Sequence, residues 1–195
     1  GTFSGQVQMW HIGLRREEEE LKFGNGDAVL CMAVGARGTR LVVGGKSAHV
    51  VVYAICLPDL GEGLVDDCDS VPLLKEIGRF APAGTVLSLT VDAKASIVCT
   101  GGEAKLVQIW SLYGIDEVAD WKAEKPVAAF RCPSIVHSVC LTAVGAHLAV
   151  GLSDCTEVYH LEHGRRSTLG AGDEIKPEKS KSFYACNGLA LVLSK

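Results

Sequence analysis

Long apolar runs and a surplus of basic residues are both missing from this sequence. No uninterrupted apolar stretch approaches the roughly 20 residues that a membrane-spanning helix needs, so we predict no membrane span. The 19 Lys and Arg residues are outnumbered by 23 Asp and Glu residues, and the net charge of −4 argues against a nucleic-acid partner. Because 48% of the residues are hydrophobic and 22% are charged, the chain is too apolar for disorder and we expect a folded domain.

Recognisable catalytic and metal-binding motifs are also missing. The sequence has no G-x-S-x-G elbow, no H-E-x-x-H, no P-loop and no G-x-G-x-x-G. His160 and His163 form an H-x-x-H pair, but on a strand their side chains point to opposite faces. The acidic group Asp66, Asp67 and Asp69 lacks the spacing and the closing Glu of an EF-hand. We therefore predict no catalytic residue, no cofactor and no metal, and we expect that the chain is not an enzyme.

The eight cysteines contain no Cys-x-x-C pair, which excludes a zinc ribbon and a thioredoxin-like motif. Cys31, Cys99 and Cys140 lie inside apolar runs, as small buried hydrophobic residues do. We predict free thiols and an intracellular location, cytoplasmic or nuclear. The sequence begins with Gly1 and no signal peptide opens it, so we expect a trimmed or processed piece of a longer protein.

What the sequence does contain is an internal repeat. A short alternating run that ends in an aromatic residue recurs at intervals of about 50 residues, a spacing in the range of repeat proteins. A run that ends in glycine precedes three of these copies: "TRLVVGG", "ASIVCTGG" and "AHLAVG". A further apolar run precedes each of those, and we align Leu30, Met32 and Val34 with Leu87, Leu89 and Val91, and with Val139, Leu141 and Ala143. The repeated aromatic residues are Trp10, Tyr53, Trp110 and Tyr159.

The repeating unit is a strand, a small turn, a second strand, a glycine-containing turn, a third strand and a segment of variable length. The first two variable segments end in apolar stretches, 73–80 and 127–130, that suit a fourth strand. This pattern resembles a divergent WD40-repeat β-propeller, in which each repeat forms a four-stranded blade. The Trp-Asp of that family is not retained, because His, Ala, Ser and His follow the four aromatic residues. The family's Gly-His dipeptide is absent as well, so we expect its polar network of His, Ser, Asp and Trp to be missing from every repeat.

The resemblance implies an all-β fold with antiparallel blades, in which the four aromatic residues pack between blades. A β-sandwich also has many short strands, but it does not explain an internal period. We predict a single partial propeller domain over 1–195, with a half-blade at 1–23, blades at about 27–80, 84–130 and 134–183, and a second half-blade at about 183–195. Three arrangements fit: a fragment of a larger, seven-bladed ring, a ring that another chain completes by strand pairing, or four blades that close on themselves. We favour the first.

Partners of propellers commonly bind the turns between the second and third strands. In this chain the turns fall at 46–49, 103–105 and 153–156, and they are polar, although ordinary solvated turns have the same composition. Trp121 lies in a polar variable segment, where it either anchors an interface or packs on its own blade. The candidate partner-binding residues are Lys46, Ser47, His49, Glu103, Lys105, Asp154 and Trp121.

We therefore predict a non-catalytic scaffold for protein–protein interaction that acts as a subunit or domain of a larger complex. Two alternatives remain. One is a regulatory propeller domain of a larger multidomain protein or enzyme. The other is a ligand-binding or enzymatic propeller that uses its central channel, although the expected channel positions carry mainly apolar or small residues.

Overall fold

The computed structural model describes residues 1–11, 16–23, 26–47, 49–56, 74–117, 121–163 and 175–184. These residues form fifteen strands and one short 3₁₀ turn, and the prediction of an all-β fold is confirmed. Within the described ranges, no helix has the length and apolar character needed to cross a membrane. The acidic group at 66–69 lies outside the described residues. So does the predicted half-blade at 183–195, apart from residues 183 and 184.

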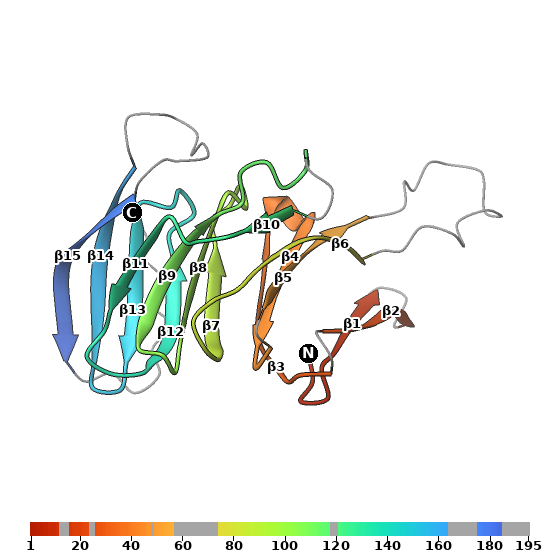
Figure 1. Ribbon diagram of the computed structural model, residues 1–195, viewed down its shortest axis with the longest axis horizontal. Helices are drawn as coiled ribbons and strands as arrows, with labels where there is room; N and C mark the ends of the chain where they lie inside the picture. Colours follow the sequence, from red (N-terminus) through yellow and green to blue (C-terminus); the bar gives the residue numbers. More distant parts are fainter. Residues whose placement is uncertain are drawn as a thin grey trace.

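The strands assemble into four sheets (Figure 1). The first sheet pairs β1 (Gln6–His11) with β2 (Arg16–Lys22). The second contains β3 (Val29–Gly35), β4 (Arg40–Gly45), β5 (Val50–Ile55), β6 (Leu74–Phe80) and β10 (Trp121–Ala123), with the 3₁₀ turn Ala36–Gly38 between β3 and β4. The third contains β7 (Val86–Val91), β8 (Ile97–Gly102), β9 (Leu106–Ser111) and β11 (Ala128–Arg131). The fourth contains β12 (Val136–Leu141), β13 (His147–Leu152), β14 (Cys155–His163) and β15 (Ile175–Tyr184).

The second, third and fourth sheets repeat one register. In each, the first two strands have an irregular pairing, after which a residue of the first strand lies opposite a glycine of the second: Cys31 opposite Gly44, Ser88 opposite Gly101, and Ser138 opposite Gly151. By this register Met32, Leu89 and Val139 occupy equivalent positions, as do Val34, Val91 and Leu141.

This register corrects one part of the sequence alignment. Val139 corresponds to Leu89 and not to Leu87, so the predicted alignment of the third copy was displaced by two residues. The error has a physical reason. A strand alternates with period two, so a shift of two residues leaves the apolar pattern intact.

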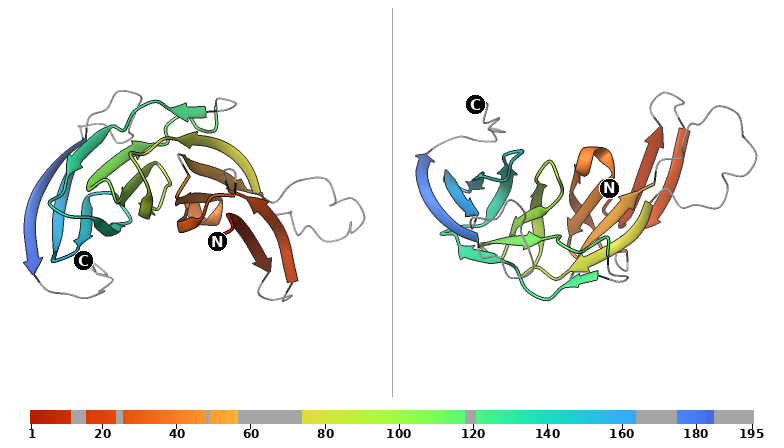
Figure 2. Two further views of the ribbon diagram at one scale, coloured as in Figure 1. Left: turned by 60° about the horizontal axis from the view of Figure 1, so that its bottom comes forward. Right: turned by 90° about the horizontal axis from the view of Figure 1, so that it is seen from above.

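The four sheets stand side by side in an open arc, with the β1–β2 pair at one end and β15 at the other (Figure 2). The strands β3, β7 and β12 line the inner side of the arc, and neighbouring inner strands contact each other. At the junction between the third and fourth sheets, the backbone N–H of Val139 donates to Ser88 Oγ at 3.0 Å and the N–H of Leu141 donates to Thr90 Oγ1 at 3.3 Å. Side chains of one inner strand therefore satisfy backbone donors of the next.

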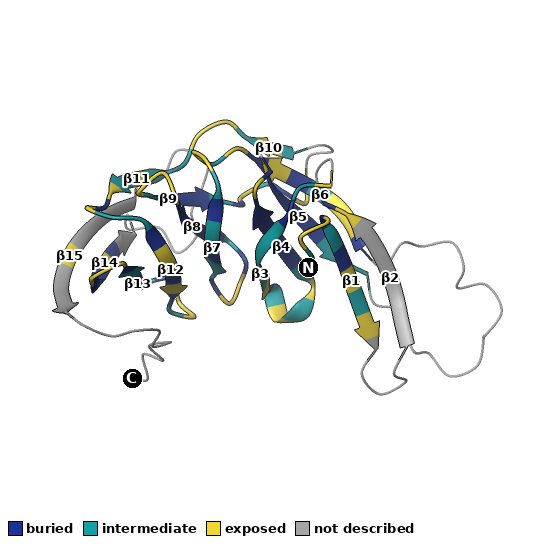
Figure 3. Ribbon diagram, turned by 90° about the horizontal axis from the view of Figure 1, so that it is seen from below, coloured by how far each residue is buried: buried dark blue, intermediate teal, exposed yellow. Residues whose placement is uncertain are grey.

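Hydrophobic cores fill the junctions between sheets, so the middle sheets are buried on both faces. One core joins Val7 and Phe23 of the first sheet region to Val43 and Tyr53 of the second. A second core lies between the second and third sheets, and a third core lies between the third and fourth. As a result, every residue of β8 is buried, the polar Thr100 included (Figure 3). Burial of apolar surface at these junctions, at about 25 cal/mol per Å², is the main force that holds the sheets together.

The second sheet gains a fifth strand from the segment between β9 and β11 of the third sheet. The strand β10 pairs in parallel with the outer strand β6, and Trp121 lies opposite Gly78. From the sequence alone this segment is predicted to be a variable loop, because a strand of three residues is too short to show a periodic pattern. The strand physically links two neighbouring sheets.

Candidate functional site

The turns between the second and third strands of the three larger sheets lie on one rim of the arc. The inner strands run in the same direction. The starts of β3 and β7 lie together, because Cys31 Sγ donates to Val86 O at 3.6 Å. The ends of β7 and β12 also lie together, because Ala93 N donates to Ala143 O at 3.0 Å. Each second strand is antiparallel to its inner strand and ends beside the inner strand's start. Two bonds place these ends: Lys46 N donates to Ala28 O at 3.0 Å and Glu103 N donates to Thr85 O at 3.3 Å.

Five of the predicted partner-binding residues are exposed on this rim, which we call the turn rim: Lys46, His49, Glu103, Lys105 and Asp154. Lys46 lies on the turn of the second sheet, Glu103 and Lys105 on that of the third, and Asp154 on that of the fourth, so these residues give the rim no field of one sign. It presents separate charged groups on hydrogen-bonded turns, an arrangement suited to a polar protein surface.

Ser47 differs from its prediction as a partner-binding residue. It is buried, and its Oγ accepts a hydrogen bond from His49 N at 3.3 Å. A serine hydroxyl that bonds the backbone two residues later stabilises a tight turn. Its role in the structure is therefore to hold the turn that presents Lys46 and His49.

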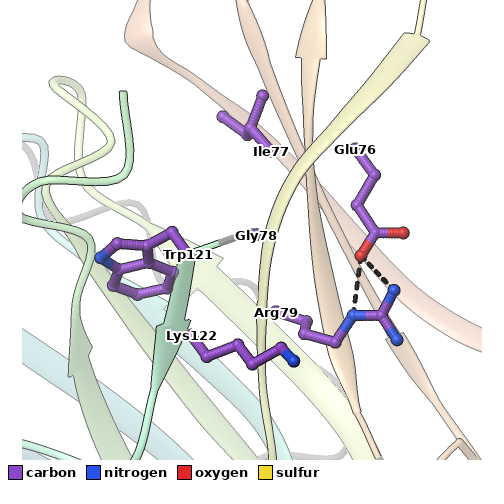
Figure 4. Close-up of a pocket in the computed structure, with 6 residues that line it drawn as sticks. All are labelled: Glu76, Ile77, Gly78, Arg79, Trp121 and Lys122. Carbon is purple, nitrogen blue, oxygen red and sulfur yellow. Dashed lines mark hydrogen bonds and ion pairs between the residues drawn. The ribbon is translucent and has the colours of Figure 1, made fainter. Parts of the chain in front are cut away.

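Trp121 is half-buried, and it packs both on β6 of the second sheet, which β10 joins, and on the segment that follows β9 (Figure 4). Its indole lies over Gly78, where an added Cβ would be 2.8 Å from Trp121 Cε3. The indole Nε1–H donates to Tyr113 O at 3.1 Å. These contacts occupy much of the side chain and give Trp121 a packing role. Binding of a partner by Trp121 stays a prediction.

A cavity of about 260 Å³ adjoins Trp121 at the β6–β10 pair. Its charged lining is partly neutralised, because Arg79 Nε donates to Glu76 Oε1 at 2.8 Å and Arg79 Nη2 lies 2.6 Å from the same oxygen (Figure 4). None of the described residues that line this cavity is a Ser, Thr, Cys or His. Its lining residues are Glu76, Ile77, Gly78, Arg79, Trp121 and Lys122.

The four repeated aromatic residues lie on the third strand of their repeats, but they are not equally covered. Trp110 is 1% exposed and stacks on Phe80 of the preceding sheet, with ring centroids 4.5 Å apart. Tyr159 packs likewise on Phe130 of the preceding sheet at 4.4 Å, and Tyr53 is also buried. Trp10 differs from the prediction that it packs between blades, since it is 55% exposed. The reason is its position on β1 at the end of the arc, where the described residues form no preceding sheet.

Buried polar groups support the strands at positions that the sequence pattern does not reveal. The indole Nε1–H of Trp110 donates to Thr100 Oγ1 at 3.3 Å, so this repeat does contain one polar contact of the kind expected to be absent. Asp92 is buried, and its Oδ1 accepts the N–H groups of Ser96 at 2.6 Å and Ile97 at 2.8 Å. A short polar turn between two apolar runs was the only available signal for Asp92.

A second buried acid, Glu157, lies on β14. Its Oε2 accepts the hydroxyl of Tyr159 at 2.5 Å, and its Oε1 accepts Lys179 Nζ of β15. Burial, followed by the hydrogen bond to Glu157, raises the pKa of Tyr159 well above its ordinary value. The tyrosine therefore stays protonated and serves as a hydrogen-bond donor to the carboxylate.

The cysteines of the described residues form no disulfide. Burial raises the pKa of the Cys31 thiol to about 12, an effect that a hydrogen bond with the Gly44 backbone partly offsets. Burial, with a smaller contribution from Asp92, raises the pKa of Cys99 further still. Since the thiolate is the reactive form, both thiols are unsuited to nucleophilic chemistry.

Two of the six histidines form a close pair. His147 and His160 lie opposite each other on β13 and β14, with ring centroids 4.9 Å apart. In the part of the chain that the structure describes, no group of three or more His, Cys, Asp or Glu side chains could hold a metal ion.

No family model matches the sequence, and no curated protein matches it. The fold is similar to chains in solved structures of Polycomb Repressive Complex 2 from Chaetomium thermophilum. In the crystal structure of that complex the TM-score is 0.66 at 13% identity, over 85% of this chain and 34% of that chain. In a humanized mutant bound to the inhibitor GSK126 the TM-score is 0.66 at 12% identity, over 88% of this chain and 36% of that chain.

A third structure of this complex, with H3K27me3 and H3K27M, gives a TM-score of 0.64 at 13% identity, over 84% of this chain and 33% of that chain. The chain thus spans about a third of the length of the solved chains that it matches. At this level of identity the likeness shows a shared β-rich fold.

Proposed function

We propose that this chain is a non-catalytic protein-interaction module, built as part of a WD40-type β-propeller, and that it works as a subunit or domain of a larger complex. The observation that carries the proposal is the arc of equivalent sheets, which presents three polar turns on one rim. The likeness to chains of a multi-protein complex supports protein partners for this chain as well.

The propeller interpretation is supported by irregularities that recur with the repeat. The pairing of the third and fourth strands shifts directly before the aromatic residue in three sheets: between Met9 and Trp10, between Val52 and Tyr53, and between Val158 and Tyr159. Bulges at the same place in successive sheets indicate one repeated unit. The open arc, together with the match to a third of longer chains, favours part of a larger ring over four self-closed blades.

We place the binding surface on the turn rim and the protein inside the cell, in the cytoplasm or the nucleus. Exposed charges at the edge of an interface chiefly control the rate and specificity of association. The mixed charges of Lys46, Glu103, Lys105 and Asp154 suit a partner with a complementary pattern of separate charges.

The test compares charge reversals on the two rims. The variant Lys46→Glu with Lys105→Glu changes the turn rim, and the variant Arg37→Glu with Lys94→Glu makes the same change of charge on the opposite rim. The control is closely matched, since all four residues are exposed and both Arg37 (φ 58) and Lys105 (φ 56) have left-handed backbones.

Partners are captured with the unmodified chain, and their affinities are then measured with purified proteins. We expect the turn-rim variant to bind about tenfold more weakly, while the control changes by less than about threefold. Equal effects of the two variants, or none from the turn-rim variant, would contradict the proposal.

A further inference from the structure

Two histidines lie side by side on the fourth sheet, at the end that is remote from the turn rim. His147 begins β13 and is the register partner of His160 on β14, and their ring centroids are 4.9 Å apart. Both residues are exposed, and within the described ranges neither ring is hydrogen-bonded. The ring of His137 on the same sheet is instead bonded to Ser153 Oγ at 3.1 Å. The close pair therefore offers imidazole nitrogens to a ligand.

The packing of the repeat does not require this pair. Counted from the glycine that lies opposite each inner strand, the equivalent pairs are Arg40 with Ala54 in the second sheet and Ile97 with Ser111 in the third. These positions serve contact with the following sheet, since Ile97 is buried in the next junction and Arg40 Nη1 donates to Ala95 O at 3.1 Å. Only the fourth sheet carries two metal-binding side chains there.

The separation of the two rings suits chelation of one metal ion. A metal that is about 2.1 Å from an imidazole nitrogen is about 3.2 Å from the ring centroid. Two imidazoles at bond angles of about 90–110° then have centroids about 4.5–5.2 Å apart, and the observed 4.9 Å lies within this range. The planes are inclined at 69°, so rotation of the exposed rings about χ2, a soft torsion, directs one nitrogen of each ring to a common point.

The backbone holds both histidines in place. His147 N donates to Thr142 Oγ1 at 3.0 Å, and Thr142 N donates to His147 O at 2.9 Å across the turn between β12 and β13. Beside His160, Leu161 N donates to Ala146 O at 2.8 Å, and Leu161 is 1% exposed. A metal therefore has to order side chains and not backbone, which lowers the entropic cost of binding.

The residue on the other side of His160 is an acid. Glu178 on β15 is the register partner of His160, so His147, His160 and Glu178 form one row across three strands. The place of Glu178 is given by the backbone register alone, and residues directly opposite each other have Cβ atoms about 4.5–5.5 Å apart. Two imidazoles and a carboxylate are a ligand set that Zn²⁺ takes, whereas Mg²⁺ and Ca²⁺ prefer oxygen ligands.

We propose that His147, His160 and Glu178 bind one divalent transition-metal ion of the Zn²⁺ type. The fourth tetrahedral position is left for water or for a side chain of a neighbouring sheet or partner. The metal links the last three strands of the fourth sheet, and it stabilises the folded chain because it binds only where those strands are paired. No short motif contains these residues, since they come from three strands, which explains why the sequence predicts no metal.

The test follows the rings themselves. The chain is freed of metal with a chelator and titrated with Zn²⁺ while the imidazole nitrogen NMR signals of its six histidines are recorded. We expect the signals of His147 and His160 to shift together and to saturate at one equivalent, while that of His137 stays in place. Mg²⁺ at the same concentrations should shift none of them. Zinc bound by cysteines is recognised because it leaves the two rings unshifted.

Variants identify the ligands. His147→Ala and Glu178→Gln should each raise the Zn²⁺ concentration that shifts the His160 signal by at least about tenfold, because even a residue that only supports a metal ligand is worth about 10–100-fold in affinity. The matched control, His137→Ala on the same sheet, should stay within about twofold of the unmodified chain. Backbone amide spectra without metal should match in all four proteins, since both members of the His pair are exposed.

The proposal is overturned if His147 and His160 shift only at the Zn²⁺ concentration that shifts His137, or if zinc saturates the chain without shifting them. An unchanged affinity of His147→Ala would also contradict it, and an unchanged affinity of Glu178→Gln would remove the acid from the ligand set. None of these residues lies on the turn rim, so this proposal and the proposed function can fail separately.

Discussion

The pair Trp110 and Trp10 gives the sharpest stability prediction, because equivalent positions differ in coverage. Trp110 is 1% exposed, stacks on Phe80 at 4.5 Å and donates to Thr100, whereas Trp10 is 55% exposed. Replacement of a buried Trp by Ala costs about 3–5 kcal/mol, since transfer energy is lost and a cavity remains. Replacement of a half-exposed Trp should cost about 1 kcal/mol.

Urea unfolding of Trp110→Ala and Trp10→Ala, followed by circular dichroism, measures both losses. The variant Trp110→Phe separates the contributions, because it keeps an aromatic ring on Phe80 but leaves Thr100 without the indole donor. We expect a loss of about 1–2 kcal/mol for it. Equal losses for Trp10→Ala and Trp110→Ala would refute the argument that a preceding sheet stabilises Trp110 and is missing beside Trp10.

Three further predictions concern other junctions. Gly78→Ala should displace β10, because the new Cβ would lie 2.8 Å from Trp121 Cε3. Acrylamide quenching of Trp121 fluorescence should therefore rise, and unchanged quenching would contradict this. Tyr159→Phe should lower the free energy of unfolding by about 1–3 kcal/mol, because the buried carboxylate of Glu157 loses a donor, and a neutral effect in urea unfolding would count against that role. The folded protein holds the Cys31 proton more tightly than the unfolded chain does, since folding raises the thiol pKa from 9.0 to about 12. The resulting contribution to the free energy of unfolding is complete below pH 9 and is lost as the pH rises towards 12. Cys31→Ala should flatten the decrease of stability above pH 9, and an identical pH profile for the variant would argue against it.

Much of the strand pattern could be predicted because it is local. Alternation with period two identified the first three strands of each repeat, and glycine turns separated them. The apolar stretches at 73–80 and 127–130 coincide with β6 (Leu74–Phe80) and β11 (Ala128–Arg131). The same periodicity produced the two-residue error in the third copy, since it does not distinguish registers that differ by two.

The features that the sequence did not reveal depend on contacts between distant segments. The strand β10 exists because Gly78 leaves room for Trp121, more than forty positions later in the chain. The exposure of Trp10 depends on a missing neighbour, although its local sequence resembles that around Trp110. In the candidate site, polarity predicted which turns are presented, but it could not show that Ser47 turns inward to hold the backbone.

Backbone amide hydrogen exchange of the chain as it stands tests the central claim most directly, because the three inner strands serve as each other's controls. If the arc is open beside β3, amides of β3 should exchange at least about tenfold faster than those of β7 and β12, which neighbouring sheets cover on that side. Equal protection of β3, β7 and β12 would contradict an open arc.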